Sequence, residues 1–306
     1  MRKPNGLNLG DTVMIIAPSS PPNIDNVMKM KSKIEKAGLH VLIGKGVKEK
    51  RGYLAGSDEN KVSDLHVAFS NSEVKAVLCA TGGYGSGRLL QDIDFELIKN
   101  NPKIFWGYSD ITALHIAFQQ KANLVTFHGP MIQECGADHV LAETIASYKQ
   151  LLEPLCFTFT ASEKNTYPAF SHSVTAPMTG GNLTVLTSTI GTPYEVDTKG
   201  KILFIEDIQE EPYRIDRMIN QLRLAKKFDD CVGVIFGDFH DCGPQKRQAS
   251  LTIPEIVYDH IVPLGLPILS GFPIGHCSPN YGVPFGVPVT MNGADQTLSF
   301  EPGIHK

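Results

Sequence analysis

The 306-residue chain is predicted to be a two-domain α/β protein whose N-terminal half contains a parallel sheet. In that half, short apolar or β-branched runs alternate with segments whose apolar residues recur at helical spacing. A polar stretch then separates this half from a second region that mixes strands and helices. With 42% hydrophobic residues, the chain is long enough to bury two cores.

The N-terminal domain, residues 1–152, alternates strands with helices. The expected strands are 12–17, 40–43, 74–79, 104–106 and 124–127. The expected helices are 23–37, 57–71, 86–99, 110–120 and 140–152. This order is typical of a doubly wound, flavodoxin-like sheet with helices on both faces. Ligands of such folds bind at the carboxyl ends of the strands.

The C-terminal domain, residues 175–306, follows a segment, 153–174, that we interpret as an interdomain linker plus a strand. Its expected elements are a helix after Asn182, a strand over 201–206, a helix over 212–225, a strand over 232–236 and a Pro- and Gly-rich strand region from 263 onward. The pattern predicts a mixed β/α domain.

Composition excludes several classes of partner. The net charge is -4 and no run of basic residues occurs, so we expect binding neither to nucleic acid nor to an anionic membrane. The N-terminal residues lead directly into an apolar strand, so we expect no signal peptide, and no apolar run approaches the roughly 18 residues of a membrane span. The six cysteines form no CxxC pair, which favours reduced thiols. We therefore expect a cytoplasmic protein.

Residues 103–114 carry the strongest functional signal. An apolar strand runs into a tight turn with one serine, Ser109, and continues as an amphipathic helix. This is the layout of a nucleophile elbow, in which a helix N-terminus favours the oxyanion formed after attack. Ile111 stands where the hydrolase elbow has its second glycine, and a serine or aspartate after a strand is also an ordinary helix N-cap.

Two other strand ends supply the partners that a serine nucleophile needs. The strand from residue 201 ends in Glu206 and Asp207, and residues 271–276 end in His276. An imidazole takes the serine proton, and a carboxylate fixes the imidazole tautomer. Neighbours on a strand face opposite sides, so only one of the two acids can point at His276. Two other histidines, His115 and His128, are rival candidates near the elbow.

A glycine-dense loop, residues 81–88, follows the third expected strand. Its backbone N–H groups can form a nest for an oxyanion or carboxylate. A dinucleotide site is disfavoured, because Arg88 stands where the third glycine of G-x-G-x-x-G is required. A plain tight turn remains an alternative. Arg88 either binds a substrate carboxylate or forms a salt bridge on the helix.

Residues 238–242 contain Asp238, His240 and Cys242, which resemble a metal cluster in composition. The segment lacks a second ligand pair at a zinc-motif spacing, so we interpret it as a solvated turn after the preceding strand and expect no metal.

Four segments together resemble the LD-carboxypeptidase family of serine peptidases, and within it the cytoplasmic murein peptide carboxypeptidases. They are Gly10-Asp-Thr-Val-Met-Ile-Ile-Ala-Pro-Ser19, Thr81-Gly-Gly-Tyr-Gly-Ser-Gly-Arg88, Trp106-Gly-Tyr-Ser-Asp-Ile111, and Phe204-Ile-Glu-Asp-Ile208 with Gly275-His276. The resemblance spans nearly the whole chain.

The resemblance implies a set of site residues. Ser109 would be the nucleophile, Glu206 the orienting acid and His276 the general base. The backbone N–H groups of Gly83 and Asp110 would form the oxyanion hole. Further implied or candidate substrate contacts are Tyr84, Arg88 and Asn182, although N-capping of the following helix explains Asn182 equally well. With Ser109 in one domain and both partners in the other, the site is expected in an interdomain cleft.

The expected activity is release of a C-terminal D-amino acid, D-alanine, from murein tetrapeptides during cell-wall recycling. No cofactor is expected, and the resemblance implies a homodimer. The nearest alternative is a self-immunity peptidase that cleaves peptidyl or aminoacyl nucleotide antibiotics. That activity needs a surface for an adenylate, and Trp106 is the chain's one tryptophan. Alternatives from other classes are a noncatalytic small-ligand receptor and a nucleotide-dependent oxidoreductase.

Overall fold

The structure, a computed structural model, describes residues 1–161, 167–246 and 249–306. Contacts within the chain divide it into two compact units. Unit 1 comprises Met1–Leu155, Pro279–Gly286 and Pro302–Lys306, and unit 2 comprises Cys156–Ser278 and Val287–Glu301.

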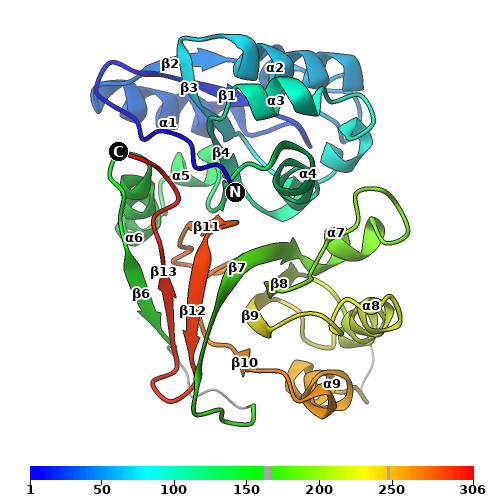
Figure 1. The fold of residues 1–306 in the computed structure, drawn as a ribbon. Coiled ribbons are helices and arrows are strands. Elements are labelled where there is room, and N and C mark those ends of the chain that lie inside the picture. Colours follow the sequence, from blue (N-terminus) through cyan, green and yellow to red (C-terminus); the bar gives the residue numbers. More distant parts are fainter. Residues whose placement is uncertain (162–166, 247–248) are drawn as a thin grey trace. The chain divides into compact units, whose positions relative to one another are not determined.

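Unit 1 is built on a six-stranded sheet (Figure 1). Its strands are β1 (Thr12–Ile16), β2 (His40–Ile43), β3 (Val74–Cys79), β4 (Ile104–Gly107), β5 (Thr126–His128) and β11 (Val283–Phe285). The order is β2-β1-β3-β4-β5-β11, and the first five strands are parallel. That order is the flavodoxin-like one, so the predicted fold class is confirmed.

The α-helices of unit 1 are α1 (Ile24–Lys36), α2 (Asp58–Ser70), α3 (Phe95–Asn100), α4 (Thr112–Ala122), α5 (Ile132–Cys135) and α6 (Ala142–Ala146). Helix α1 packs against α5, whereas α3 packs against both α2 and α4. Short 3-10 turns lie between them: η1 (Lys45–Lys48), η2 (Ser86–Leu89), η3 (Ser109–Ile111) and η4 (Ser147–Leu151).

Two of the expected helices are shorter than the sequence pattern predicts. The segment 86–99 divides into η2 and α3, because Asp94 caps a new helix by accepting a hydrogen bond from the Leu97 N–H at 2.9 Å. The segment 140–152 divides into α6 and η4. Apolar periodicity continues across both breaks, so it did not reveal them.

Unit 2 contains a seven-stranded mixed sheet with the order β10-β9-β8-β7-β12-β13-β6. Its strands are β6 (Phe157–Thr160), β7 (Ser173–Asn182), β8 (Ile202–Ile208), β9 (Gly233–His240), β10 (Ile268–Leu269), β12 (Pro288–Asn292) and β13 (Thr297–Phe300). The long strand β7 joins two halves of the sheet, since it pairs antiparallel with β12 through residues 173–177 and parallel with β8 through 178–182. The expected mixed β/α architecture is thus present.

The helices of unit 2 are α7 (Leu183–Ser188), α8 (Pro212–Leu224) and α9 (Ile253–His260), followed by the 3-10 turn η5 (Val262–Leu264). Helices α7 and α9 each pack against α8 (Figure 1). Helix α9 was not predicted, although Thr252 and Glu255 form a capping box that the T-x-x-E spacing indicates. Within the described part of the chain, no helix is long and apolar enough to cross a membrane.

The two units differ from the expected domain ranges at the boundary between them and near the C-terminus. The division falls between Leu155 and Cys156, and β6 lies inside the segment expected to be a linker plus a strand. Residues 162–166 of that segment lie outside the described residues. Residues 279–286 and 302–306 belong to unit 1, because β11 pairs with β5 and Ile304 packs into the core of unit 1.

Candidate active site

Ser109 lies directly after the carboxyl end of β4 in a strained turn. Its φ angle is +62°, in the left-handed region that a non-glycine residue adopts only at a cost of about 1–3 kcal/mol. An N-cap residue would instead have an extended backbone. The residue that precedes α4 is Ile111, which makes no capping hydrogen bond with its side chain. The turn therefore has the conformation of a nucleophile elbow and not that of a capped helix.

The glycine loop lies against this elbow. A Cβ atom built on Gly82 would be 3.1 Å from Ser109 Oγ, so the loop backbone contacts the serine side chain closely. Gly83 has a φ of +98°, and a Cβ atom there would be 2.3 Å from Ser20 Oγ. Only glycine fits this position. Within unit 1, the structure thus brings the predicted nucleophile together with the loop expected to supply an oxyanion donor.

The same loop disfavours the nucleotide alternative. It continues into η2, a 3-10 turn of four residues, whereas a dinucleotide site requires the N-terminus of a longer helix. Tyr84 on this loop is 53% exposed, and its ring meets the ring of Tyr53 edge to face at 5.7 Å.

Arg88 is engaged by Asp58 in a bidentate ion pair. The guanidinium Nη2 lies 2.5 Å from Asp58 Oδ2, and Nε lies 3.2 Å from Oδ1. Asp58 also pairs with the buried Lys61 ammonium at 3.0 Å. Hydrogen bonding from Arg88 is the largest influence that lowers the pKa of Asp58 to about 2. Of the two roles considered for Arg88, unit 1 contains the salt bridge. Binding of a substrate carboxylate by Arg88 stays a prediction.

His115 supports the backbone just before the elbow. Its Nε2 donates to the Gly107 carbonyl oxygen at 2.8 Å, and the Gly129 N–H donates to the same oxygen at 3.1 Å. His115 is fully buried, and desolvation lowers the pKa of its imidazole to about 4. The ring is therefore neutral at pH 7. His115 anchors the end of β4 and is not placed as a general base.

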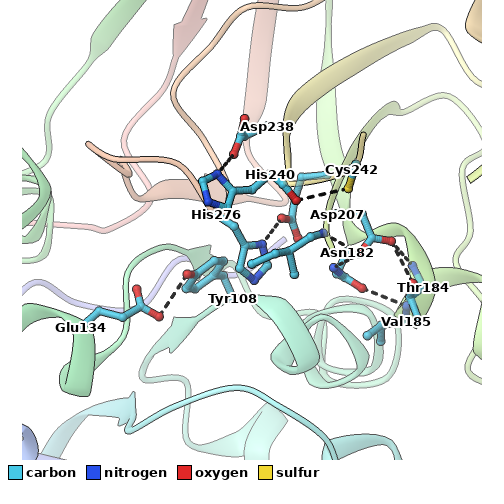
Figure 2. A network of polar contacts seen from close by, with 12 residues as sticks. Tyr108, Glu134, Asn182, Thr184, Val185, Asp207, Asp238, His240, Cys242 and His276 are labelled. Atoms are coloured by element: carbon cyan, nitrogen blue, oxygen red, sulfur yellow. Dashed lines mark hydrogen bonds and ion pairs between the residues drawn. The ribbon is translucent and has the colours of Figure 1, made fainter. Parts of the chain in front are cut away.

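The side chain of Tyr108, between Gly107 and Ser109, is anchored as well. Its hydroxyl donates to Glu134 Oε1 at 3.0 Å (Figure 2), and its ring meets that of His128 edge to face at 5.5 Å. Trp106, two residues earlier, is completely buried and stacks on Tyr148 at 4.5 Å.

In unit 2, the predicted acid and base meet. His276 Nδ1 lies 2.6 Å from Glu206 Oε2, and Glu206 is fully buried near the carboxyl end of β8. A carboxylate at Nδ1 selects the tautomer whose Nε2 carries the lone pair, which is the form a general base requires. Ser109 belongs to unit 1 and this dyad to unit 2, so the expected interdomain cleft stays a prediction.

Asp207 points away from the dyad, as alternation along a strand predicts. Its carboxylate accepts hydrogen bonds from Asn182 Nδ2 at 3.0 Å and from the Thr184 N–H and hydroxyl at 3.0 and 2.9 Å (Figure 2). Asn182 Oδ1 accepts from the Val185 N–H at 3.2 Å and so caps α7. These contacts account for Asn182 structurally, and its contact with substrate stays a prediction.

The segment expected to be a turn after residue 237 is instead part of strand β9, which runs to His240. Asp238 and His240 alternate to the same side of β9, and His240 Nδ1 lies 3.4 Å from Asp238 Oδ2. Backbone pairing of β9 with β8 explains the extension. Among the described residues, no group of three or more potential ligands is placed to hold a metal ion.

Two cysteines of unit 2, Cys242 and Cys277, are poor nucleophiles. Burial raises the pKa of the Cys277 thiol to about 12 and that of the Cys242 thiol to about 12. At neutral pH both stay protonated, and the thiol form does not attack carbonyls.

Unit 1 thus contains a serine in a strained elbow, and unit 2 contains a histidine paired with a buried carboxylate. Comparison with known proteins identifies the family. Residues 13–129 match the family model described as the LD-carboxypeptidase N-terminal domain, and residues 175–291 match the LD-carboxypeptidase C-terminal domain. The chain belongs to the LD-carboxypeptidase family and is a serine-type carboxypeptidase.

Three relatives illustrate the similarity. A protein of Bacillus subtilis (strain 168) named "Probable murein peptide carboxypeptidase" is 50% identical, over 99% of this chain and 95% of its own. The crystal structure of muramoyltetrapeptide carboxypeptidase from Oxalobacter formigenes has a TM-score of 0.85 at 27% identity, covering 94% and 97% of the two chains. The microcin C7 self-immunity protein MccF of Escherichia coli is 26% identical over 96% of this chain and 94% of its own. Its wild-type structure has a TM-score of 0.89 at 25% identity, covering 98% of each chain.

The first prediction concerns the buried imidazole beneath the elbow. The unfolded chain protonates His115 near pH 6.5, whereas the folded chain does so only near pH 4. The folded state therefore loses stability as the pH falls below 6.5. Between pH 7 and pH 5, the wild type should lose about 2 kcal/mol more free energy of unfolding than a His115→Gln variant. Urea unfolding at both pH values measures this difference, and equal losses in the two proteins would contradict it.

Proposed function

We propose that this carboxypeptidase releases the C-terminal D-amino acid, D-alanine, from murein tetrapeptides in cell-wall recycling. The observation that carries the proposal is the left-handed Ser109 at the carboxyl end of β4, in contact with the glycine loop. Two similarities support murein peptides as the substrate class. They are the 50% identity to the Bacillus subtilis relative and the likeness of the fold to that of a muramoyltetrapeptide carboxypeptidase.

In the proposed mechanism, Ser109 Oγ attacks the scissile carbonyl while His276 Nε2 accepts its proton. Glu206 holds Nδ1–H and stabilises the imidazolium that forms. The N–H groups of Gly83 and Asp110 stabilise the tetrahedral oxyanion. His276 then protonates the leaving amine of the D-amino acid. A water molecule, deprotonated by the same imidazole, hydrolyses the acyl-enzyme.

Substrate contacts in this proposal come from Tyr84, Arg88 and Asn182. Arg88 carries the positive charge that suits the terminal carboxylate, and recruiting it would require exchange with Asp58. The proposal needs no cofactor and no metal, since His276 activates both the serine and the water. The proposal also includes a cytoplasmic location, which is consistent with the free cysteines. It includes a homodimer as well, which the family resemblance implies.

One specific observation makes the self-immunity alternative less well supported than the murein peptide proposal. Binding of an adenylate commonly uses an exposed aromatic face. The chain has one tryptophan, Trp106, and it is completely buried beneath the elbow, stacked between Tyr148 and Phe127. Trp106 therefore offers no face to a nucleotide, and the exposed rings beside the glycine loop, Tyr84 and Tyr53, already meet each other edge to face. A noncatalytic ligand-binding protein, the other alternative, would not need a strained serine at a strand end.

The second prediction tests the three proposed catalytic residues as a unit. Ser109→Ala and His276→Ala should each lower kcat by up to about 10⁶-fold, and the double variant should be little worse, because the residues act together. Glu206→Gln should fold but react more slowly. His260→Ala is a matched control, since His260 forms another imidazole–carboxylate pair in unit 2, with Asp216 at 2.7 Å.

Kinetics on a murein tetrapeptide and labelling by a fluorophosphonate measure these effects. The Ser109→Ala variant should not be labelled. Additive losses in the double variant, or turnover by Ser109→Ala, would count against the mechanism. If the wild type is labelled but cleaves no peptide, the serine mechanism would stand and the proposed substrate would be refuted.

The third prediction concerns the leaving residue. Inverting its chirality exchanges the positions of carboxylate and side chain, so the carboxylate misses its binding group and the scissile carbonyl is misaligned. Tetrapeptides ending in D-Ala should have a kcat/KM at least about 100-fold above those ending in L-Ala or in D-Ala amide, equivalent to about 2.7 kcal/mol. Comparable rates on all three peptides would refute a carboxypeptidase. If Arg88 binds the carboxylate, Arg88→Ala should raise KM for D-Ala peptides and leave the amide unaffected.

The fourth prediction is that activity survives metal chelation. The proposed water activation depends on His276 and not on a Lewis acid. Dialysis against EDTA should leave kcat within twofold of the untreated enzyme. Loss of activity that zinc restores would show that the mechanism is incomplete.

A further inference from the structure

The two proposed oxyanion donors lie on different segments of unit 1. Gly83 belongs to the loop after β3, whereas Asp110 belongs to the elbow after β4. An oxyanion hole works only when both N–H groups point at one atom from about 2.7–3.1 Å. A misplacement of about 1 Å costs on the order of 100-fold in rate. Some contact must therefore fix the spacing of the two segments.

The side chain of Asp110 makes such a contact. Its Oδ2 accepts a hydrogen bond from the Ser86 N–H of the glycine loop at 2.8 Å. The Ser86 hydroxyl donates in return to the Asp110 carbonyl oxygen at 2.5 Å. The elbow and the glycine loop are thus joined twice, once through the carboxylate and once through the backbone.

A third segment, after β1, joins the same network. The Ser19 hydroxyl donates to Asp110 Oδ2 at 2.5 Å. The neighbouring Ser20 holds the glycine loop from the other side, because its N–H donates to Gly82 O at 3.1 Å and its hydroxyl accepts from the Tyr84 N–H at 3.1 Å. Three adjacent strand ends, those of β1, β3 and β4, are therefore linked around Gly83.

Burial makes these hydrogen bonds strong. Ser19 and Ser86 are fully buried and Asp110 is 6% exposed. Hydrogen bonds to a carboxylate are roughly twice as strong as those between neutral groups. Removing one partner leaves a buried polar group unsatisfied, and the surrounding backbone shifts to compensate. The shift would fall on the two N–H groups and on Ser109, which precedes Asp110.

We propose that the Asp110 carboxylate, held by Ser19 and Ser86, is a positioning device that sets the spacing of the oxyanion donors and keeps the elbow in its strained conformation. This inference rests on the proposed function, in which those donors act on the reaction. Asp110 thus contributes twice, through its backbone N–H to the oxyanion and through its side chain to the geometry of the site. The side chain does not touch the reacting atoms.

The fifth prediction tests this role with Ser19→Ala, Ser86→Ala and Asp110→Asn. Each serine variant should lower kcat about tenfold and Asp110→Asn about 100-fold, the scale of a displaced catalytic group, while KM stays within threefold of the wild type. Affinity for a boronic acid peptide, which forms a tetrahedral adduct with the serine, should fall in parallel with kcat/KM. Affinity for the tripeptide product should not change.

Asp64→Asn is the matched control. Asp64 is also a buried carboxylate of unit 1 and accepts hydrogen bonds from the Lys45 and Gly46 N–H groups at 2.9 and 2.8 Å, at the end of β2. This variant should lose stability to urea while its kcat stays within twofold of the wild type. A purely structural role of Asp110 would give Asp110→Asn the same behaviour and would overturn the proposal.

The rate of fluorophosphonate labelling distinguishes failure of this proposal from failure of the proposed function. In that reaction Ser109 Oγ attacks phosphorus, fluoride leaves, and the phosphoryl oxygen occupies the oxyanion hole. If the wild type is labelled but cleaves no murein peptide, the substrate is wrong, and slower labelling of the three variants still supports the positioning role. If all three variants are labelled at the wild-type rate, the positioning role is refuted.

Discussion

The left-handed backbone of Ser109 is a constraint that the surrounding residues of the N-terminal unit must support. Such a conformation persists only where the surroundings hold it, and here they do so on both sides. Before the serine, the Gly107 carbonyl accepts hydrogen bonds from His115 and Gly129. After it, Asp110 is fixed by Ser19 and Ser86. The parallel sheet places all of these groups at one edge, so the same topology that builds the core also supports the strained turn.

Unit 2 buries two consecutive acids, Glu206 and Asp207. An isolated buried carboxylate is costly, so each needs partners. Glu206 pairs with His276, whereas Asp207 is satisfied by Asn182, Thr184 and its neighbour's backbone. The pairing of β8 with β9 shifts register between Ile205 and Asp207. Such an irregularity redirects a side chain, and it lies at the residue that orients the imidazole.

The sequence predicted what depends on local pattern. The parallel strands of unit 1 and the elbow at Ser109 follow from apolar runs that end in polar residues. The choice of Glu206 as the partner of His276 came from the family resemblance. Contacts between distant segments were not predictable in this way. Nothing local in residues 283–285 indicates that they pair with β5, and the continuation of β9 through Asp238 depends on its neighbour β8. Asp110 was assigned only a backbone role, because its partner Ser19 is 91 residues away.

The glycine loop carries a proposed catalytic N–H group and the proposed substrate contacts within one short segment. Its backbone is fixed by the half-buried Ser20 and the buried Asp110, and Gly83 admits no side chain. Of its exposed side chains, Tyr84 contacts Tyr53 and Arg88 pairs with Asp58 at the surface of unit 1. Substitution of an exposed side chain leaves the buried hydrogen bonds in place. The loop can therefore change which groups it presents at the surface without moving the N–H group that the proposed mechanism uses. This separation is consistent with one fold that serves both murein peptidases and self-immunity proteins.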